Sequence, residues 1–141
     1  MENISKYKDL VYNIIGAAMK VHSTIGWGLL EAVYQECLHL ELLDREIFNE
    51  REKEIEIKYK NHVLEKKYRM DLVVDNIIIE LKAVSDITAE HRAQLCNYLR
   101  LTHKPLGILI NFGEDTLICE RWAYDKNNNE CYLVDKNMQQ L

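Results

Sequence analysis

The chain has 141 residues, 48% of them hydrophobic, and a formal net charge of −5 at pH 7, which is typical of one globular domain with a substantial core. This charge argues against a protein that coats nucleic acid non-specifically, but it is compatible with an enzyme that binds phosphates locally through metal ions. No apolar run approaches the ~20 residues that span a membrane, and the N-terminal segment lacks the apolar region of a signal peptide.

The cysteines are Cys37, Cys96, Cys119 and Cys131. They lie far apart, and their spacing matches no zinc-ligand motif. We therefore expect reduced, mostly buried thiols in a cytoplasmic protein.

Two helices are predicted at the N-terminal end. Apolar side chains between residues 8 and 25 recur at i, i+3, i+4 and i+7, which indicates an amphipathic helix. Gly26-Trp27-Gly28 interrupts it, and a second helix follows over 29–44. In that helix Glu31 shares a side with the apolar Tyr34, which is an unusual place for a carboxylate. The ordinary alternative is an acidic residue that complements the helix dipole.

From Ile47 onward the hydrophobic period changes to two. Apolar and charged residues alternate over 54–60, which predicts a half-buried strand. Asn61-His62 is a predicted turn, and 63–70 returns toward the next strand. Segment 51–69 also has seven basic residues against four Glu, a local excess of three positive charges.

The stretch Tyr68–Lys82 is predicted to form a β-hairpin. Its two apolar runs, Leu72–Val74 and Ile77–Ile79, are separated by Asp75-Asn76, and these residue types tolerate the left-handed backbone of a two-residue turn. A two-residue turn fixes the register of the whole hairpin.

In this register Asp71 lies across from Glu80, and both project on the same side as Lys82. Two carboxylates whose Cβ atoms are roughly 5 Å apart repel each other. A divalent cation with oxygen ligands would relieve the repulsion, with Lys82 as an adjacent point charge. The ordinary alternative is that all three residues belong to the solvated face of a sheet.

A third helix is predicted over about 87–102, with Thr88 or Asp86 as its cap. The following run, Ile108–Phe112, is apolar at every position except Asn111, as in a strand covered on both faces.

Residues 116–124 alternate as a further strand, and the polar tail over 125–141 contains at most a short strand at 132–134. The predicted order is α-α-β-β-β-α-β-β, a mixed α/β (α+β) sheet flanked by helices. We expect a single domain over 1–141 with its core at about 8–122.

Several spaced residues form an ordered set along the chain. They are Gly28, Glu31, Tyr34, Asp71, Glu80, Leu81, Lys82, Gln94, Tyr98, Asn111, Phe112 and Gly113. This set resembles the GxxExxY proteins, a small branch of the PD-(D/E)xK nuclease superfamily. The proline of the superfamily's name is absent, because Met70 precedes Asp71. The resemblance implies a restriction-endonuclease-like αβββαβ core.

The resemblance further implies phosphodiester hydrolysis assisted by Mg²⁺ or Mn²⁺. Asp71 and Glu80 would bind the metal, and the carbonyl oxygen of Leu81 is a further expected ligand. Glu31 would complete the carboxylate cluster directly or through a water. Such a metal lowers the pKa of bound water and neutralises charge in the transition state.

Three more residues are assigned catalytic roles by the resemblance. Lys82 would position the attacking water and stabilise developing charge. Gln94 and Tyr98 lie one helical turn apart and would contact metal-bound water or the DNA backbone. An exposed helix residue and a half-buried core aromatic are the ordinary alternatives for these two.

Basic residues of segment 51–69 are predicted to follow the phosphates of nucleic acid beside the site. The alternative is a charged hairpin face that is only solvated. The predicted contacts are Lys58, Lys60, Lys66, Lys67 and Arg69, with His91 as a candidate phosphate contact.

The sequence is therefore compatible with three functions. The first is a metal-dependent nuclease that acts on DNA, and the complete carboxylate and lysine set favours it. The second is a catalytically weak or inactive relative that binds nucleic acid or a protein partner, which the net acidity favours. The third is a structural domain that uses 71–82 as a salt-bridge network. Trp27 and Leu29 are candidate residues of a homodimer interface.

Overall fold

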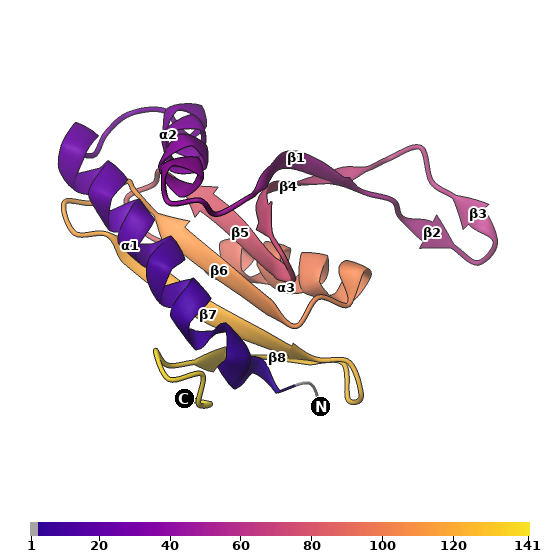
Figure 1. Ribbon diagram of the computed structural model, residues 1–141. Coiled ribbons are helices and arrows are strands. Elements are labelled where there is room, and N and C mark those ends of the chain that lie inside the picture. Colours follow the sequence, from indigo (N-terminus) through magenta and orange to yellow (C-terminus); the bar gives the residue numbers. More distant parts are fainter. Residues whose placement is uncertain (1–2) are drawn as a thin grey trace.

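The structure is a computed structural model that describes residues 3–141. A 3-10 helix at Ile4–Tyr7 precedes α1 (Lys8–Ile25), α2 (Glu31–Asp44), β1 (Glu50–Ile55), β2 (Lys58–Tyr59), β3 (His62–Val63), β4 (Tyr68–Val74), β5 (Ile77–Lys82), α3 (Ala89–Thr102), β6 (Leu106–Asn111), β7 (Ile118–Asp125) and β8 (Glu130–Val134). Six strands form one sheet in the order β1-β4-β5-β6-β7-β8 (Figure 1). The predicted mixed sheet flanked by helices is confirmed.

The hairpin β4–β5 has the predicted register. Val74 pairs with Ile77, and two further pairs follow toward the open end of the hairpin. Asp75 takes the left-handed backbone conformation, with φ 53°, that a two-residue turn requires. Strands β5 and β6 run parallel and are joined through α3, whereas the other neighbours are antiparallel.

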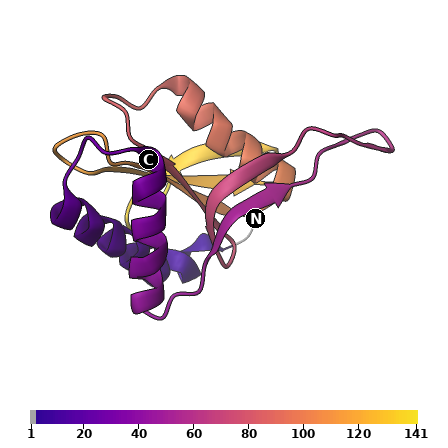
Figure 2. The ribbon, with the colours of Figure 1, turned by 90° about the horizontal axis from the view of Figure 1, so that it is seen from above.

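Helices α1 and α2 cover one face of the sheet and α3 covers the other (Figure 2). Strand β6 is buried at all six positions, including the polar Asn111, because it lies between both helical layers. None of the helices between residues 3 and 141 is long and apolar enough to cross a bilayer.

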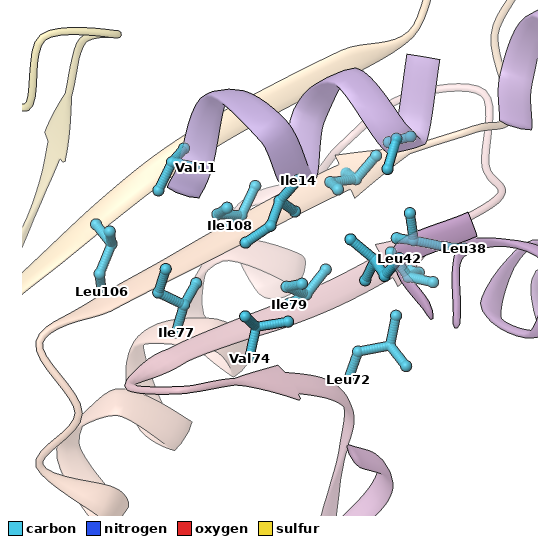
Figure 3. Packing of buried hydrophobic residues seen from close by; sticks show 14 of the residues in the cluster. Val11, Ile14, Leu38, Leu42, Leu72, Val74, Ile77, Ile79, Leu106 and Ile108 are labelled. Carbon is cyan, nitrogen blue, oxygen red and sulfur yellow. The ribbon is translucent and has the colours of Figure 1, made fainter. Parts of the chain in front are cut away.

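The larger part of the core lies beneath α1 and α2. Aliphatic side chains from these helices pack onto aliphatic side chains of the central strands, and burial of this surface stabilises the fold at about 25 cal/mol per Å². Figure 3 shows Val11, Ile14, Leu38 and Leu42 above Leu72, Val74, Ile77, Ile79, Leu106 and Ile108.

The predicted strand over 54–60 is wrong in its bounds. Strand β1 begins earlier, at Glu50, and ends at Ile55, where the chain leaves the sheet. The following residues form a separate two-stranded ribbon, β2–β3, which projects from the body of the protein (Figure 1). Alternation alone does not distinguish a strand that stays in the sheet from one that leaves it.

The polar tail contributes more than predicted, because β8 pairs with β7 over five residues and forms the edge of the sheet. Helix α3 begins after Thr88, one of the two predicted caps. Thr88 Oγ1 accepts a hydrogen bond from the His91 N–H, and the Thr88 N–H donates one to His91 Nδ1.

Candidate functional site

Asp71 and Glu80 meet where the pairing of β4 with β5 stops. The last paired residues are Leu72 and Ile79. Beyond them the Asp71 N–H donates to Glu80 Oε1 over 3.0 Å, and the Leu81 N–H donates to Asp71 Oδ2 over 2.8 Å. Each carboxylate therefore takes a main-chain donor of the opposite strand, which fixes both side chains at the mouth of the hairpin.

Both carboxylates are poorly hydrated. Glu80 is only 3% exposed, and its burial, together with the charge of Asp71, raises its pKa well above the ordinary value. Burial also raises the pKa of Asp71, against the opposing effects of the Leu81 N–H and Lys82. Negative charge is therefore costly here unless a cation accompanies it.

Glu31 approaches these carboxylates from the first residue of α2. Its pKa is raised by loss of hydration and by the charges of Asp71 and Glu52, and lowered by Lys82. In the described part of the chain no three His, Cys, Asp or Glu residues stand close enough to hold a metal ion as a ready group. The oxygen donors nevertheless fit Mg²⁺, which is commonly held by one or two carboxylates while it keeps several waters.

Lys82 is held by the crossover helix. Its ammonium donates to Gln94 Oε1 over 3.1 Å, and Gln94 Nε2 donates to the Tyr98 hydroxyl over 3.1 Å. Burial and the charge of Glu80 raise the pKa of Tyr98 to about 12, so this phenol stays protonated near neutral pH. Within residues 3–141 Lys82 makes no ion pair, which argues against a salt-bridge network as the purpose of the cluster.

Two residues of the site were not predicted. Gln35 is buried on α2, and its Nε2 donates to Glu52 Oε1 over 2.9 Å and to Asp71 Oδ1 over 3.3 Å. Glu52 has φ 51° in the middle of β1, between two pairs that join β1 to β4. Gln35 follows Glu31 by four residues, so helical spacing was the signal that could have identified it.

The remaining residues of the predicted motif brace the backbone around the site. The Tyr34 ring stacks on Phe112 at 4.6 Å, and its hydroxyl donates to the Gly26 carbonyl and accepts from the Leu29 N–H. A Cβ at Gly113 would lie 2.2 Å from the Val84 carbonyl oxygen, so only glycine fits there.

Asn111 completes this brace. Its Nδ2 donates to the Val84 carbonyl over 2.9 Å, and its Oδ1 accepts from the Val84 and Gly113 N–H groups. The segment that follows Lys82 is therefore pinned to the end of β6.

An open groove of about 330 Å³ lies beside the Lys82 cluster. The exposed face of Tyr68 forms part of its wall, and the ring of Tyr68 lies 5.6 Å from that of Tyr98. The lining residues are Tyr68, Glu90, Ala93, Gln94, Asn97 and Tyr98.

The predicted basic strip is divided by the structure. Lys58 belongs to β2 and Lys60 follows it, so both are part of the ribbon that projects from the body of the protein (Figure 1). Lys67 and Arg69 lie nearer the sheet and form exposed ion pairs with Glu54, at 3.5 and 3.7 Å.

Lys66 is exposed on the segment that returns from the ribbon. His91 is at the start of α3, where burial and the nearby Lys82 lower its pKa. His91 therefore has an electrostatic link to the cluster.

This chain is similar to known proteins both in sequence and in fold. A family model described as PD-(D/E)XK nuclease superfamily matches residues 8–121. The solved structure described as "Crystal structure of SSO0001" is similar to this chain, with a TM-score of 0.54 and 22% identity over 88% of this chain and 64% of that one. The chain thus spans less than two thirds of that protein, and the likeness supports the fold alone. None of the curated proteins compared matches.

Proposed function

Since the chain belongs to the PD-(D/E)XK nuclease superfamily, we propose that it hydrolyses phosphodiester bonds of nucleic acid, DNA in particular, with Mg²⁺ or Mn²⁺. The observation that carries the proposal is the buried Glu80 carboxylate beside Asp71, with the Lys82 ammonium directed at Gln94. Burial of two adjacent carboxylates is unfavourable, and Lys82 and the main-chain donors offset this only in part. The ordered set from Gly28 to Gly113 supports the GxxExxY branch.

Asp71, Glu80 and the Leu81 carbonyl would hold the metal, with Glu31 as a ligand through water. The bound ion would lower the pKa of a water and offset charge on the phosphate. Lys82 binds the phosphate or the attacking water on the α3 side, because Gln94 fixes the direction of its ammonium. This arrangement makes Lys82 and the carboxylates the catalytic residues.

Gln94 and Tyr98 act on the same side of the substrate. Gln94 orients Lys82, and the neutral Tyr98 hydroxyl donates a hydrogen bond to a phosphate oxygen or to water.

The substrate would continue from the site along α3 and the ribbon. His91, Lys58, Lys60 and Lys66 supply phosphate contacts, and Tyr68 offers a ring on which a base can stack. Lys67 and Arg69 would bind a phosphate that takes the place of Glu54 in their ion pairs. All four cysteines are free thiols, which supports the proposed cytoplasmic location. We also propose that residues 1–141 form one domain.

The second candidate function is binding of nucleic acid or of a protein partner. In this case the chain is a relative of the nucleases that cleaves slowly or not at all. It is favoured by the lack, in residues 3–141, of a ready three-ligand group for a metal.

Calorimetry of Mg²⁺ and Mn²⁺ binding tests the proposal, with and without a short DNA duplex. We expect binding to the wild type and none to Asp71→Ala or Glu80→Ala, whereas Asp115→Ala, an exposed acidic position, binds normally. A wild type that binds neither metal under both conditions contradicts the proposal. Metal binding without cleavage of labelled DNA or RNA supports the second function.

A further inference from the structure

Arg121, on β7, lies on the apolar side of the sheet. Side chains alternate along a strand, so Cys119 and Ala123 share this side with it. The residues paired with Arg121 on the neighbouring strands are Ile108 and Val134. All four neighbours belong to the core beneath α1 and α2 or pack against it. A guanidinium among apolar neighbours needs a specific reason, because burial of an unpaired charge is unfavourable.

The Arg121 side chain has no acidic partner in the described part of the chain. It is partly buried, and its Nε is buried without a hydrogen-bond partner among residues 3–141. None of the ion pairs within these residues includes it. Burial raises the pKa of the nearby Cys119 thiol to about 12, and the positive charge of Arg121 opposes this rise. Buried donors of native proteins normally have an acceptor, so Arg121 Nε calls for an acceptor that residues 3–141 do not supply.

Arg121 lines an open groove of about 600 Å³, and the two carboxylates along this groove already bind other groups. Glu120 accepts hydrogen bonds from Arg92 Nε and from a terminal nitrogen of the same guanidinium, each over 2.9 Å. Asp135 Oδ1 accepts from two main-chain N–H groups of the segment that follows it, over 2.8 and 3.0 Å. Both carboxylates are therefore held in place by bonds to groups other than Arg121.

Lys136 is a second cation along the same groove. It is exposed, and within the described residues it makes no ion pair. Two positive charges without acidic partners therefore line one groove, in a protein whose formal net charge is −5. This combination favours a ligand that brings two negative charges.

A phosphate monoester has the required charge and shape. It carries about −1.5 to −2 near neutral pH. A guanidinium binds two phosphate oxygens through parallel N–H donors, and an ammonium acts beside it as a point charge. Sites for small molecules have volumes of about 300–1,000 Å³. The groove at Arg121 falls in this range, so it has room for the organic part of a ligand beside Leu133 and Val134.

We propose that this groove binds a small phosphate monoester, with its phosphate on Arg121 and Lys136. Arg121 Nε and one terminal nitrogen donate to two phosphate oxygens, and Lys136 neutralises the second charge. The site is separate from the catalytic cluster, because the Lys82 ammonium donates to Gln94 on α3, which covers the other side of the sheet. The inference therefore does not depend on the proposed hydrolysis.

Calorimetry of the full chain in a chelator tests the site, with inorganic phosphate, phenyl phosphate and phenol as probes. The wild type should bind both phosphates at millimolar concentration and not phenol. Arg121→Gln should weaken this binding at least tenfold, because hydrogen bonds to charged groups are lost. Arg100→Gln is the matched control, since Arg100 is also partly buried but donates to Asn97 Oδ1. This variant and Lys82→Met should bind phosphate as the wild type does.

A wild type that binds neither phosphate overturns the proposal, as does an affinity that Arg121→Gln leaves unchanged. Binding that is lost in Lys82→Met and retained in Arg121→Gln places the phosphate at the catalytic cluster and also overturns it. Circular dichroism checks that the variants fold. If Arg121→Gln does not fold, Lys136→Gln replaces it, and this exposed change should weaken binding severalfold. Equal affinity of Lys136→Gln and the wild type contradicts the site. No metal is present in these measurements, so their failure leaves the proposed function untouched.

Discussion

Replacing Glu80 by glutamine should stabilise the metal-free protein. The amide oxygen of the glutamine side chain can still accept the hydrogen bond from the Asp71 N–H, which Glu80 Oε1 accepts over 3.0 Å in the wild type. The substitution removes a charge that burial and Asp71 both make unfavourable. Removal of an unfavourable buried charge without loss of shape is worth roughly 1–3 kcal/mol. In a chain of this length that raises the melting temperature by about 3–10 °C.

Mg²⁺ should reverse this order. If Glu80 is a metal ligand, the wild type gains about 2.7 kcal/mol at a metal concentration of a hundred times Kd. The Glu80→Gln variant should gain much less, so it melts above the wild type in a chelator and no higher than it in Mg²⁺.

In the chelator, the difference in melting temperature between Glu80→Gln and the wild type should also depend on pH. A carboxyl whose folded pKa is raised stabilises the fold while it is protonated, and this stability is lost as the pH rises through the folded pKa. The advantage of Glu80→Gln should therefore be absent below the ordinary value of about 4.5 and grow with rising pH.

Differential scanning fluorimetry in chelator and in Mg²⁺, across pH, measures these effects, with Glu65→Gln at an exposed position as the control. If Glu80→Gln melts below the wild type in chelator at neutral pH, the Glu80 carboxylate stabilises the metal-free fold. This result refutes the idea that the carboxylate is unfavourable until a cation binds.

Four further changes test individual parts of the account. Gln94→Ala frees the Lys82 ammonium and should slow cleavage by ~10–100-fold, while calorimetry finds the Mg²⁺ affinity unchanged. Gln35→Leu removes a hydrogen bond that lowers the pKa of Asp71, so Mg²⁺ affinity measured by calorimetry should fall ~10-fold or more and recover partly at higher pH. Lys60→Glu should weaken DNA binding and reduce the salt dependence by about one phosphate contact, as measured by fluorescence anisotropy at several salt concentrations. Tyr68→Leu should weaken binding of single-stranded DNA by about 1–3 kcal/mol and of duplex DNA by less, in the same assay.

The centre of the site was predictable because local rules determine it. The two-residue turn fixes the register of β4 on β5, and period-two alternation then brings Asp71 and Glu80 together with Lys82. The four-residue spacing of Gln94 and Tyr98 likewise predicted that both lie on one side of α3, where a hydrogen bond joins them in the structure.

Features that depend on tertiary approach were not predictable in the same way. The contact of Gln35 with Glu52 requires β1 to pass α2, and the left-handed backbone of Glu52 leaves no signature in the sequence. The ribbon β2–β3 has the alternation of a sheet strand, yet it extends into solvent. Strand β8 was anticipated only as a short strand at 132–134, and pairing with the edge of β7 extends it over Glu130–Val134.

The central claim is that this cluster hydrolyses phosphodiester bonds. Its most direct test is the Mg²⁺- and Mn²⁺-dependent cleavage of end-labelled single-stranded and duplex DNA by the wild type and by Lys82→Met. We expect metal-dependent products from the wild type and cleavage at least a hundredfold slower in the variant, with metal binding retained. Equal cleavage by both proteins, or no cleavage by a wild type that binds metal and DNA, would contradict it.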